Sequence, residues 1–269
     1  MAKGGLPSRP PDGSRVPRAD PAPTIAMCLR PGCTATNLCN AHVVPQGFAR
    51  DVRGDGATNR RVTGTGIKAA FPALGDYDPA ILCAVCDGVL GELDKYAIET
   101  FRRFADVPLK LGTIAALDDV DGDWISRFVL AVLWRASISR RPEWRNVALG
   151  PFSDPAAAIV FGDRPLSDLP AYQLIAYRYQ RDPDLDPTRL YSTPTRARMD
   201  GLNTISIALS GFRFVAKIDR RPFAAVVAPA IINGASSLKA FVVDYRTGAD
   251  FQALVRATEA DIARGLARK

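Results

Sequence analysis

Two cysteine pairs, Cys28-Leu-Arg-Pro-Gly-Cys33 and Cys83-Ala-Val-Cys86, decide how this chain is interpreted. Between them lies the word Asn40-Ala41-His42-Val43-Val44-Pro45, which contains the only histidine of the 269 residues. All five cysteines lie between residues 28 and 86. Two close cysteine pairs on either side of a single imidazole predict a metal-built scaffold that holds a reactive group.

The first pair encloses Pro31-Gly32, a turn-forming dipeptide that lets the backbone fold tightly around an ion. A strand is expected over residues 38–44. With a period of two residues, Asn40 and His42 share one face of this strand, and Cys39 lies on the other with apolar neighbours. Cys39 is therefore expected to pack rather than to bind metal, although it stays in reserve as a replacement for Cys28 or Cys33.

The second pair opens onto an expected helix from about residue 87 to residue 105. Its apolar residues recur at helical spacing: Val89, Leu93, Tyr96, Ala97, Phe101 and Phe104. Cys86 then falls in the first helical turn, where the positive end of the helix dipole favours a thiolate.

A structural zinc ion prefers four soft ligands in a tetrahedron, commonly supplied as two cysteine pairs. We therefore expect one structural Zn²⁺ bound by Cys28, Cys33, Cys83 and Cys86. One pair on a hairpin and the other at a helix N-terminus describe a zinc-bound treble clef.

The bulk composition favours an anionic partner. The net charge is +7 and the pI is about 9.3, so nucleic acid is the expected partner, with DNA favoured over RNA. The first 24 residues lack the apolar core of a secretory signal, and the longest apolar run is Phe128 to Trp134. We expect a cytoplasmic protein with no membrane partner, in which paired cysteines favour metal over disulfides.

The expected fold class is α+β. Residues 1–24 are expected to be a disordered basic tail, residues 25–106 the zinc module, and residues 107–269 a domain of mixed helices and antiparallel sheet whose role is open. A basic loop follows the histidine word, and its glycines would allow close approach to a phosphate backbone, although a merely solvated loop is the alternative. Its basic residues are Arg50, Arg53, Arg60, Arg61 and Lys68.

The C-terminal part contains several expected elements. Residues 124–135 are apolar nearly all round and predict a core helix, in which Arg127 and Arg135 are expected to pair with carboxylates. Alternation over 203–210 and 212–219 predicts a β-hairpin. Further strands are expected over 224–227 and 241–245, and a basic helix over about 251–266. The segment 172–181 interleaves tyrosines with arginines, which is typical of core tyrosines or of a clamp for a single nucleic-acid strand.

The order of these sequence motifs resembles that of the HNH endonucleases. A cysteine pair is followed by His-hydrophobic-hydrophobic-Pro and then by Leu-Cys-x2-Cys, as in a divergent bacterial group of that family. The words Leu133-Trp134-Arg135-Ala136-Ser137 and Val147-Ala148-Leu149-Gly150-Pro151 also resemble that group. The resemblance to HNH proteins proper covers residues 28 to about 100.

The resemblance implies a ββα-metal-like nuclease site. His42 falls where the family's general base activates water, Asp78 where its middle asparagine lies, and Asp87 where many members have a metal-binding histidine. The chain departs from the pattern because it has no second histidine. Carboxylates are good ligands for Mg²⁺ or Mn²⁺, so Asp78 and Asp87 could hold such an ion.

Two functions therefore remain open on sequence alone. The first is metal-dependent endonucleolytic hydrolysis of nucleic acid phosphodiesters with His42 as general base. The second is a catalytically inactive zinc module that binds nucleic acid or protein. A nuclease needs His42 and a carboxylate close together in a cleft beside the metal, whereas a binding module needs only a basic surface.

Deleting residues 1–24 is expected to leave the melting temperature unchanged. The segment contains too few apolar residues for their burial to offset the entropic cost of chain ordering, which is about 1–2 kcal/mol per residue. Thermal denaturation of the full-length and truncated proteins checks this, and a large drop on truncation would mean that the tail is docked.

Overall fold

A computed structural model describes residues 26–53, 61–63, 66–68, 75–180, 186–189 and 191–248, together with 252, 256 and 259. The tail over residues 1–24 and most of the expected terminal helix lie outside these residues. So do the side chains of four members of the basic loop, Arg53, Arg60, Arg61 and Lys68.

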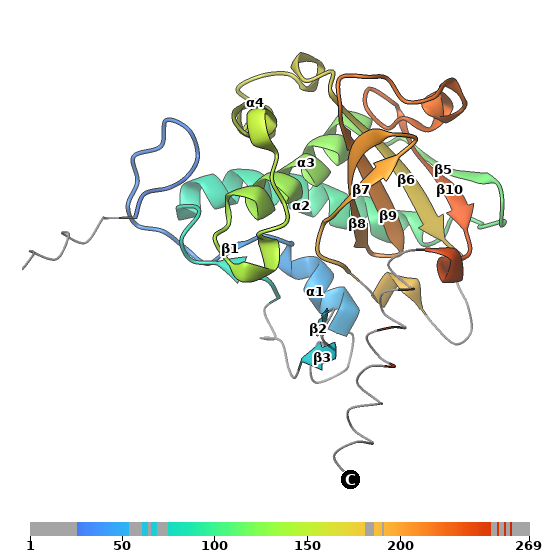
Figure 1. Ribbon diagram of the computed structural model, residues 1–269, viewed down its shortest axis with the longest axis horizontal. Helices are drawn as coiled ribbons and strands as arrows, with labels where there is room; N and C mark the ends of the chain where they lie inside the picture. Colours follow the sequence, from blue (N-terminus) through green and yellow to red (C-terminus); the bar gives the residue numbers. More distant parts are fainter. Residues whose placement is uncertain are drawn as a thin grey trace, which may run out of the picture.

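The architecture is mixed α/β and is built around a six-stranded sheet (Figure 1). The strand order is β5-β10-β6-β9-β8-β7, and every neighbouring pair is antiparallel except β10 and β6, which are parallel. The strands are β5 (Ile114–Asp118), β6 (Tyr172–Tyr179), β7 (Thr195–Met199), β8 (Leu202–Leu209), β9 (Phe212–Ile218) and β10 (Ser237–Val243).

Helices cover one face of this sheet, and two small ribbons lie beside them. The α-helices are α1 (Gln46–Arg53), α2 (Ala84–Phe104), α3 (Gly122–Ile138) and α4 (Ser153–Val160). The ribbons pair β1 (Ala41–His42) with β4 (Tyr77–Asp78), and β2 (Arg61–Thr63) with β3 (Gly66–Lys68). The short 3-10 helices are η1 (Pro142–Trp144), η2 (Gly150–Phe152), η3 (Leu166–Asp168), η4 (Pro187–Arg189), η5 (Ala225–Ala230) and η6 (Tyr245–Thr247).

Helix α3 is the expected core helix. The Asp121 carboxylate caps its N-terminus by accepting hydrogen bonds from the backbone N–H groups of Asp123 and Trp124. All seven residues of the apolar run from Phe128 to Trp134 are buried, as expected for a helix that is apolar nearly all round. Such a helix can lie only between other layers, so α3 sits between the sheet and α4.

The predicted hairpin is present as β8 and β9. The turn residues Ser210 and Gly211 have positive φ angles of 50° and 79°. Two successive left-handed residues make the tight turn whose twist matches that of antiparallel strands. The hairpin supplies two inner positions of the sheet, so its register fixes which phenylalanines face the helices.

Other expectations for this half are corrected. Residues 224–227 lie in or next to η5 and are not a strand, and the strand expected over 241–245 is the end of β10, which stops at Val243 rather than at residue 245. The segment 172–179 is the inner strand β6, in which Tyr172, Arg178 and Tyr179 are buried. Buried side chains cannot stack on bases, so the single-strand clamp is wrong for these three residues.

One aromatic cluster joins the two parts of the chain on either side of residue 106. Phe101 of α2 contacts four rings, with centroid distances of 5.7 Å to Phe48, 5.9 Å to Phe128, 5.0 Å to Phe212 and 5.2 Å to Phe214. These rings come from α1, α3 and β9. The packed core therefore continues across the predicted domain boundary.

Replacing Phe101 with alanine is expected to lower the free energy of unfolding by about 3–5 kcal/mol, because the substitution leaves a cavity among four rings. Denaturant unfolding measures the loss. Val226→Ala is the control, since this side chain is 82% exposed and its truncation should cost less than about 0.5 kcal/mol. A small loss in Phe101→Ala would contradict a shared core.

Candidate metal centre and adjoining groove

Four cysteine sulfurs converge on one point. The Sγ atoms of Cys28, Cys33, Cys83 and Cys86 all lie within 4.8 Å of one another, and those of Cys33 and Cys83 are 4.0 Å apart. A tetrahedron of sulfurs about 2.3 Å from a central zinc ion has edges of about 3.8 Å. Disulfide sulfurs lie only about 2.05 Å apart, and all five cysteines are free thiols. The geometry therefore fits a single four-thiolate metal site.

The first pair is held by a short hairpin-like loop. The Cys28 N–H donates to the carbonyl of Ala35 at 2.8 Å, and the Cys33 N–H donates to that of Arg30 at 3.0 Å. Gly32 has a φ of +79°, which a residue with a Cβ rarely adopts. The sequence Pro31-Gly32 thus supplies the turn that was expected from it.

The second pair is joined to this loop by backbone pairing. The Leu29 N–H donates to the Ile81 carbonyl at 2.8 Å, and the Cys39 N–H donates to the Leu82 carbonyl at 2.9 Å. Cys83 then forms the N-cap of α2 in an extended conformation, and Cys86 lies in the first helical turn. The metal centre is therefore built where two segments about fifty residues apart in sequence are paired.

The thiol pKa values indicate that a bound cation would stabilise this cluster. The backbone N–H of Cys86 is directed at the Cys83 sulfur and lowers the pKa of Cys83 to about 7, whereas burial raises the pKa of Cys86 to about 12 and also raises that of Cys28. Four adjacent thiolates repel one another, and burial disfavours their charge. A bound metal ion offsets both effects and keeps all four sulfurs deprotonated.

Cys39 stays outside the cluster. It is partly buried against the core, as the predicted strand alternation required, and burial raises the pKa of its thiol. Cys28 and Cys33 both belong to the cluster, so Cys39 replaces neither of them.

His42 lies on strand β1 beside the metal centre. Its neighbours Ala41 and Val43 are buried, while His42 itself is only partly buried. It pairs with Tyr77 of β4, whose ring lies 6.3 Å from the imidazole in an edge-on arrangement. The expected alternation therefore holds, although the regular strand is only two residues long.

A groove of about 410 Å³ opens in front of His42. One wall is a face of α2, and the opposite wall is formed by the end of β1 and the start of α1. Its lining residues are His42, Pro45, Gln46, Gly47, Arg50, Asp87, Gly91, Asp94, Lys95, Ile98, Glu99 and Arg102. The groove thus brings the single imidazole together with acidic and basic side chains.

Asp87 is the groove carboxylate next to the metal centre. It follows Cys86 directly in sequence and is partly buried, and its side chain has no hydrogen-bond or ion-pair partner among the described residues. Burial raises the pKa of Asp87, while the positive charge of Arg135 opposes this rise. Two of the predicted site residues, His42 and Asp87, therefore share one groove.

Asp94 is a groove residue that the sequence analysis missed. It lies seven residues after Asp87 on the same face of α2, and helical periodicity could have identified it. The buried guanidinium of Arg135 donates to both of its oxygens, at 2.7 and 2.9 Å. The expectation that Arg135 pairs with a carboxylate is confirmed. Arg127 instead donates to the carbonyls of Ile159 and Val160.

Asp78, the third predicted site residue, does not line the groove. Its side chain is 3% exposed, its Oδ1 accepts from the Ala80 N–H at 2.9 Å, and its Oδ2 accepts from the Ser139 hydroxyl at 2.5 Å. It lies opposite Ala41 in the β1–β4 ribbon. Its observed contacts thus join β4 to the end of α3.

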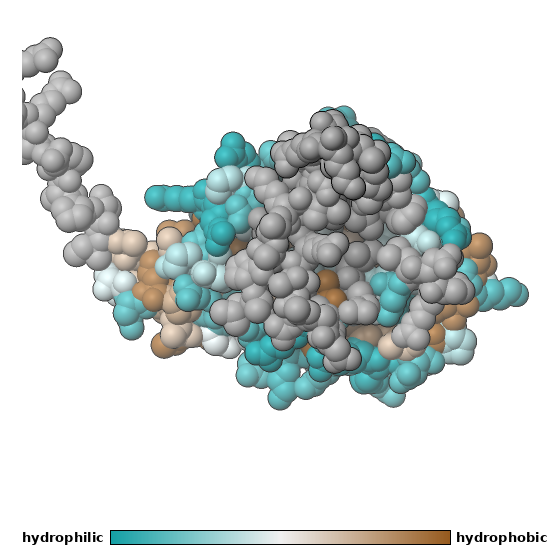
Figure 2. Space-filling model, turned by 90° about the horizontal axis from the view of Figure 1, so that it is seen from below, coloured by the Kyte–Doolittle hydropathy of each residue, from teal (hydrophilic) through white to brown (hydrophobic). Residues whose placement is uncertain are grey.

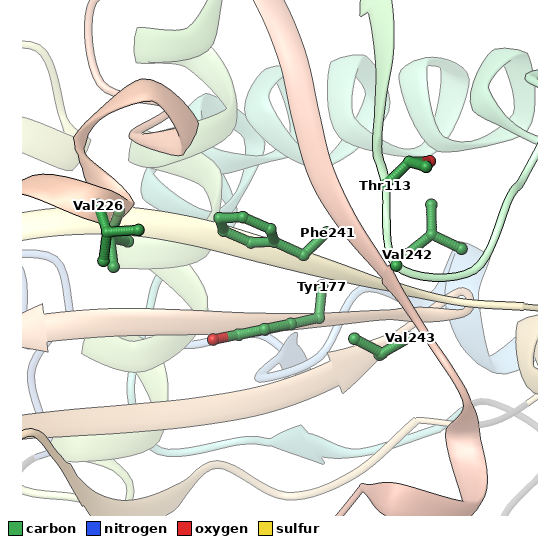
Figure 3. A pocket seen from close by; sticks show the side chains of 8 residues that line it. Thr113, Tyr177, Val226, Phe241, Val242 and Val243 are labelled. Atoms are coloured by element: carbon green, nitrogen blue, oxygen red, sulfur yellow. The ribbon is translucent and has the colours of Figure 1, made fainter.

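A second hollow, of about 320 Å³, lies at the sheet (Figure 3). The rings of Tyr177 and Phe241 are neighbours in it, with centroids 5.6 Å apart, and Val226 lies across from them. None of its lining residues is charged. Its lining is therefore mainly apolar, with the hydroxyl groups of Thr113 and Tyr177 as its polar side-chain atoms.

The described surface is mainly hydrophilic on the face shown in Figure 2, where hydrophobic residues gather toward the two ends of the molecule. Among the described residues, the large exposed hydrophobic side chains lie either around the cysteine pairs or near the sheet. They are Met27, Leu29, Val85 and Val89, and Leu111, Ile114 and Val226.

Purified protein is expected to contain one metal ion per chain, and Cys83→Ser is expected to lose that ion and to melt at a lower temperature. The reason is that a structural metal contributes its binding free energy to folding. Metal analysis and thermal denaturation measure both effects. Cys39→Ser is the matched control and should retain the metal, because its sulfur lies outside the cluster. Equal metal content in wild type and Cys83→Ser would contradict the site.

In the part of the chain that the structure describes, no helix is long and apolar enough to cross a membrane. Comparisons with protein-family models, with characterised proteins and with solved structures give no match, so the site is interpreted from its own geometry.

Proposed function

We propose that this protein is a zinc-stabilised, metal-dependent endonuclease that hydrolyses phosphodiester bonds of nucleic acid. The observation that carries the proposal is the meeting, in one groove beside the four-cysteine cluster, of His42 and the carboxylate of Asp87, which has no hydrogen-bond or ion-pair partner among the described residues. A nuclease of the HNH type requires this juxtaposition, and a purely structural metal module does not.

The four thiolates would hold Zn²⁺ in a structural role. Soft sulfur ligands in a tetrahedron select zinc, and four protein ligands leave no open coordination position for a substrate. The centre would act as a treble clef that fixes the start of α2 against the strand carrying His42. Its contribution is therefore to position the groove rather than to carry out the reaction.

His42 would act as the general base. Imidazole is the one side chain whose unperturbed pKa suits proton transfer near neutral pH, and this chain has no second one. Its partly buried ring borders the groove, where it could accept a proton from a water molecule. That water would then attack phosphorus in line with the leaving oxygen.

Asp87 would bind the catalytic cation. A half-buried carboxylate without a protein partner among the described residues is suited to bind Mg²⁺ or Mn²⁺, which prefer oxygen ligands. Such an ion supplies stabilisation of the negative charge that develops on the phosphoryl group. Asp94 would lie beside Asp87 on the α2 side of the groove, where the guanidinium of Arg135 compensates the negative charge of the Asp94 carboxylate.

The basic residues of the groove would contact substrate phosphates. Arg50 and Lys95 lie on opposite walls, and Arg102 lies further along α2. Arg102 is paired with Asp51 at 2.8 Å and Arg50 with Gln46 at 2.7 Å, so both side chains are already oriented. We assign no direct catalytic role to Asp78, whose buried oxygens bond to Ala80 and Ser139.

A catalytically inactive binding module is the second candidate, and one observation favours it. Among the described residues, the four cysteines are the only group of three or more potential ligands that lie close enough to hold one metal ion. His42, Asp87 and Asp94 line one groove without meeting that condition. In a nuclease, oxygen atoms of the substrate phosphate or of water would therefore have to complete the coordination of the catalytic cation.

Purified protein supplied with Mg²⁺ or Mn²⁺ is expected to cut DNA, and His42→Ala is expected to reduce the rate by about 10²–10⁴-fold, which is the usual contribution of general acid–base catalysis. Asp87→Ala should cause a comparable loss that rising Mn²⁺ concentration partly restores. Gel assays on supercoiled and linear DNA, and on RNA, measure both.

Glu92→Gln is the control for the charge change, because Glu92 is an exposed carboxylate of α2 outside the groove lining and its loss should leave cleavage unchanged. Cleavage that survives His42→Ala would overturn the mechanism. Salt-dependent nucleic-acid binding without cleavage of any substrate would establish the binding module instead.

A further inference from the structure

The outer face of the six-stranded sheet, opposite the helices, carries two neighbouring aromatic rings. Tyr177 of β6 and Phe241 of β10 are paired in register, and their ring centroids are 5.6 Å apart with 35° between the ring planes. Both side chains are only partly buried, and they pack against a small apolar cluster that is separate from the main core. Tyr177 thus differs from Tyr172 and Tyr179 of the same strand, which are buried.

The two rings border the hollow of about 320 Å³ at the sheet (Figure 3). Val226, which is 82% exposed, lies across from them. Among the residues that the structure describes, the Tyr177 hydroxyl has no hydrogen-bond partner. The hollow falls at the lower end of the usual size of small-ligand sites, about 300–1,000 Å³. It therefore offers flat apolar surfaces and one available hydroxyl to a small planar group.

Basic side chains flank the ring pair on the same face of the sheet. Arg213 of β9 is in register with Tyr177, and Lys239 lies two residues before Phe241 on β10, so both share the face of the rings. Neither side chain is fully buried. On β5 the carboxylate of Asp118 shares this face, four residues beyond the position that pairs with Phe241. The charges next to the rings along β9 and β10 are thus positive.

This combination matches the chemistry of single-stranded nucleic acid. Sheets that display neighbouring aromatic side chains bind single strands because every base has a π-face that stacks on a ring, while cations attract the phosphates between the bases. An apolar peptide would require no flanking cations, and a free phosphate would require no rings. In a duplex, neighbouring bases already cover each base face, so only an unpaired base can enter the hollow.

We propose that the hollow bordered by Tyr177, Phe241 and Val226 binds one base of a single-stranded nucleic acid, and that Arg213 and Lys239 contact the adjacent phosphates. The base stacks on the two rings, and its edge forms a hydrogen bond with the Tyr177 hydroxyl. This site shares no lining residue with the groove of His42. The inference rests on the proposed function for the class of partner and does not depend on cleavage.

The test measures the affinity of full-length protein for a short fluorescent oligothymidylate by anisotropy, without added Mg²⁺ or Mn²⁺. Phe241→Leu and Tyr177→Leu keep an apolar side chain but remove the π-face. Each is expected to weaken binding about 5–150-fold, which corresponds to the contribution of about 1–3 kcal/mol from one stacked base. Tyr177→Phe retains the ring and should lose less affinity than Tyr177→Leu.

An abasic strand of the same length and charge separates base stacking from phosphate attraction. Wild type should bind it more weakly than oligothymidylate, and Phe241→Leu should bind it as wild type does. Phe152→Leu is the matched control, since Phe152 is a partly buried phenylalanine that lines neither the hollow nor the groove. If circular dichroism shows that Phe241→Leu is unfolded, Val226→Gln replaces it. This substitution of an exposed side chain should weaken binding of oligothymidylate alone.

Equal affinity of wild type and the two leucine variants for oligothymidylate would overturn the base site, and so would equal affinity of wild type for the two strands. Neither result bears on cleavage, which the His42→Ala assay decides separately. A wild-type dimer that Phe241→Leu converts into a monomer, measured by sedimentation, would assign this face to a contact between two copies and would also overturn the proposal.

Discussion

The structure around the groove depends on one constraint, the convergence of four thiols from two distant segments within 4.8 Å. Burial and mutual repulsion make this arrangement costly unless a cation is shared between the sulfurs. Backbone hydrogen bonds bring the four cysteines together. The segment that follows Cys28 donates to the carbonyls of residues 81 and 82, and Cys83 forms the N-cap of α2. Once the cysteines meet, the strand with His42 and the first turn of α2 with Asp87 border the same groove.

Helix α2 carries this local arrangement into the rest of the molecule. Its first turn contains Cys86 and Asp87, its middle turns line the groove, and Phe101 near its end packs against rings from α1, α3 and β9. Arg135 adds a buried link from α3 to Asp94. Buried ion pairs contribute little net stability, and their geometry is more often a constraint on position. The groove is therefore oriented by the whole core, with the metal centre at one end of α2.

Several features could be predicted from local sequence because short-range rules govern them. The spacing of the cysteines identified the four clustered sulfurs, and helical periodicity identified α2 and α3. Alternation identified the β8–β9 hairpin and the outward direction of His42. The segment at 224–227 misled the prediction, because a short apolar run reads equally well as a strand or as the 3-10 turn η5 that it forms.

The sequence by itself thus determined the four cysteines of the candidate metal site, the single imidazole and the main helices, since each follows from residue type and spacing over a few turns. Only the tertiary structure decided which polar groups meet. It directed Asp78 into a bond with Ser139, 61 residues away, and brought Asp94 to Arg135 and Arg30 to Asp163. Such pairings depend on how helices and strands pack over long sequence separations, and no local pattern in either partner specifies the other.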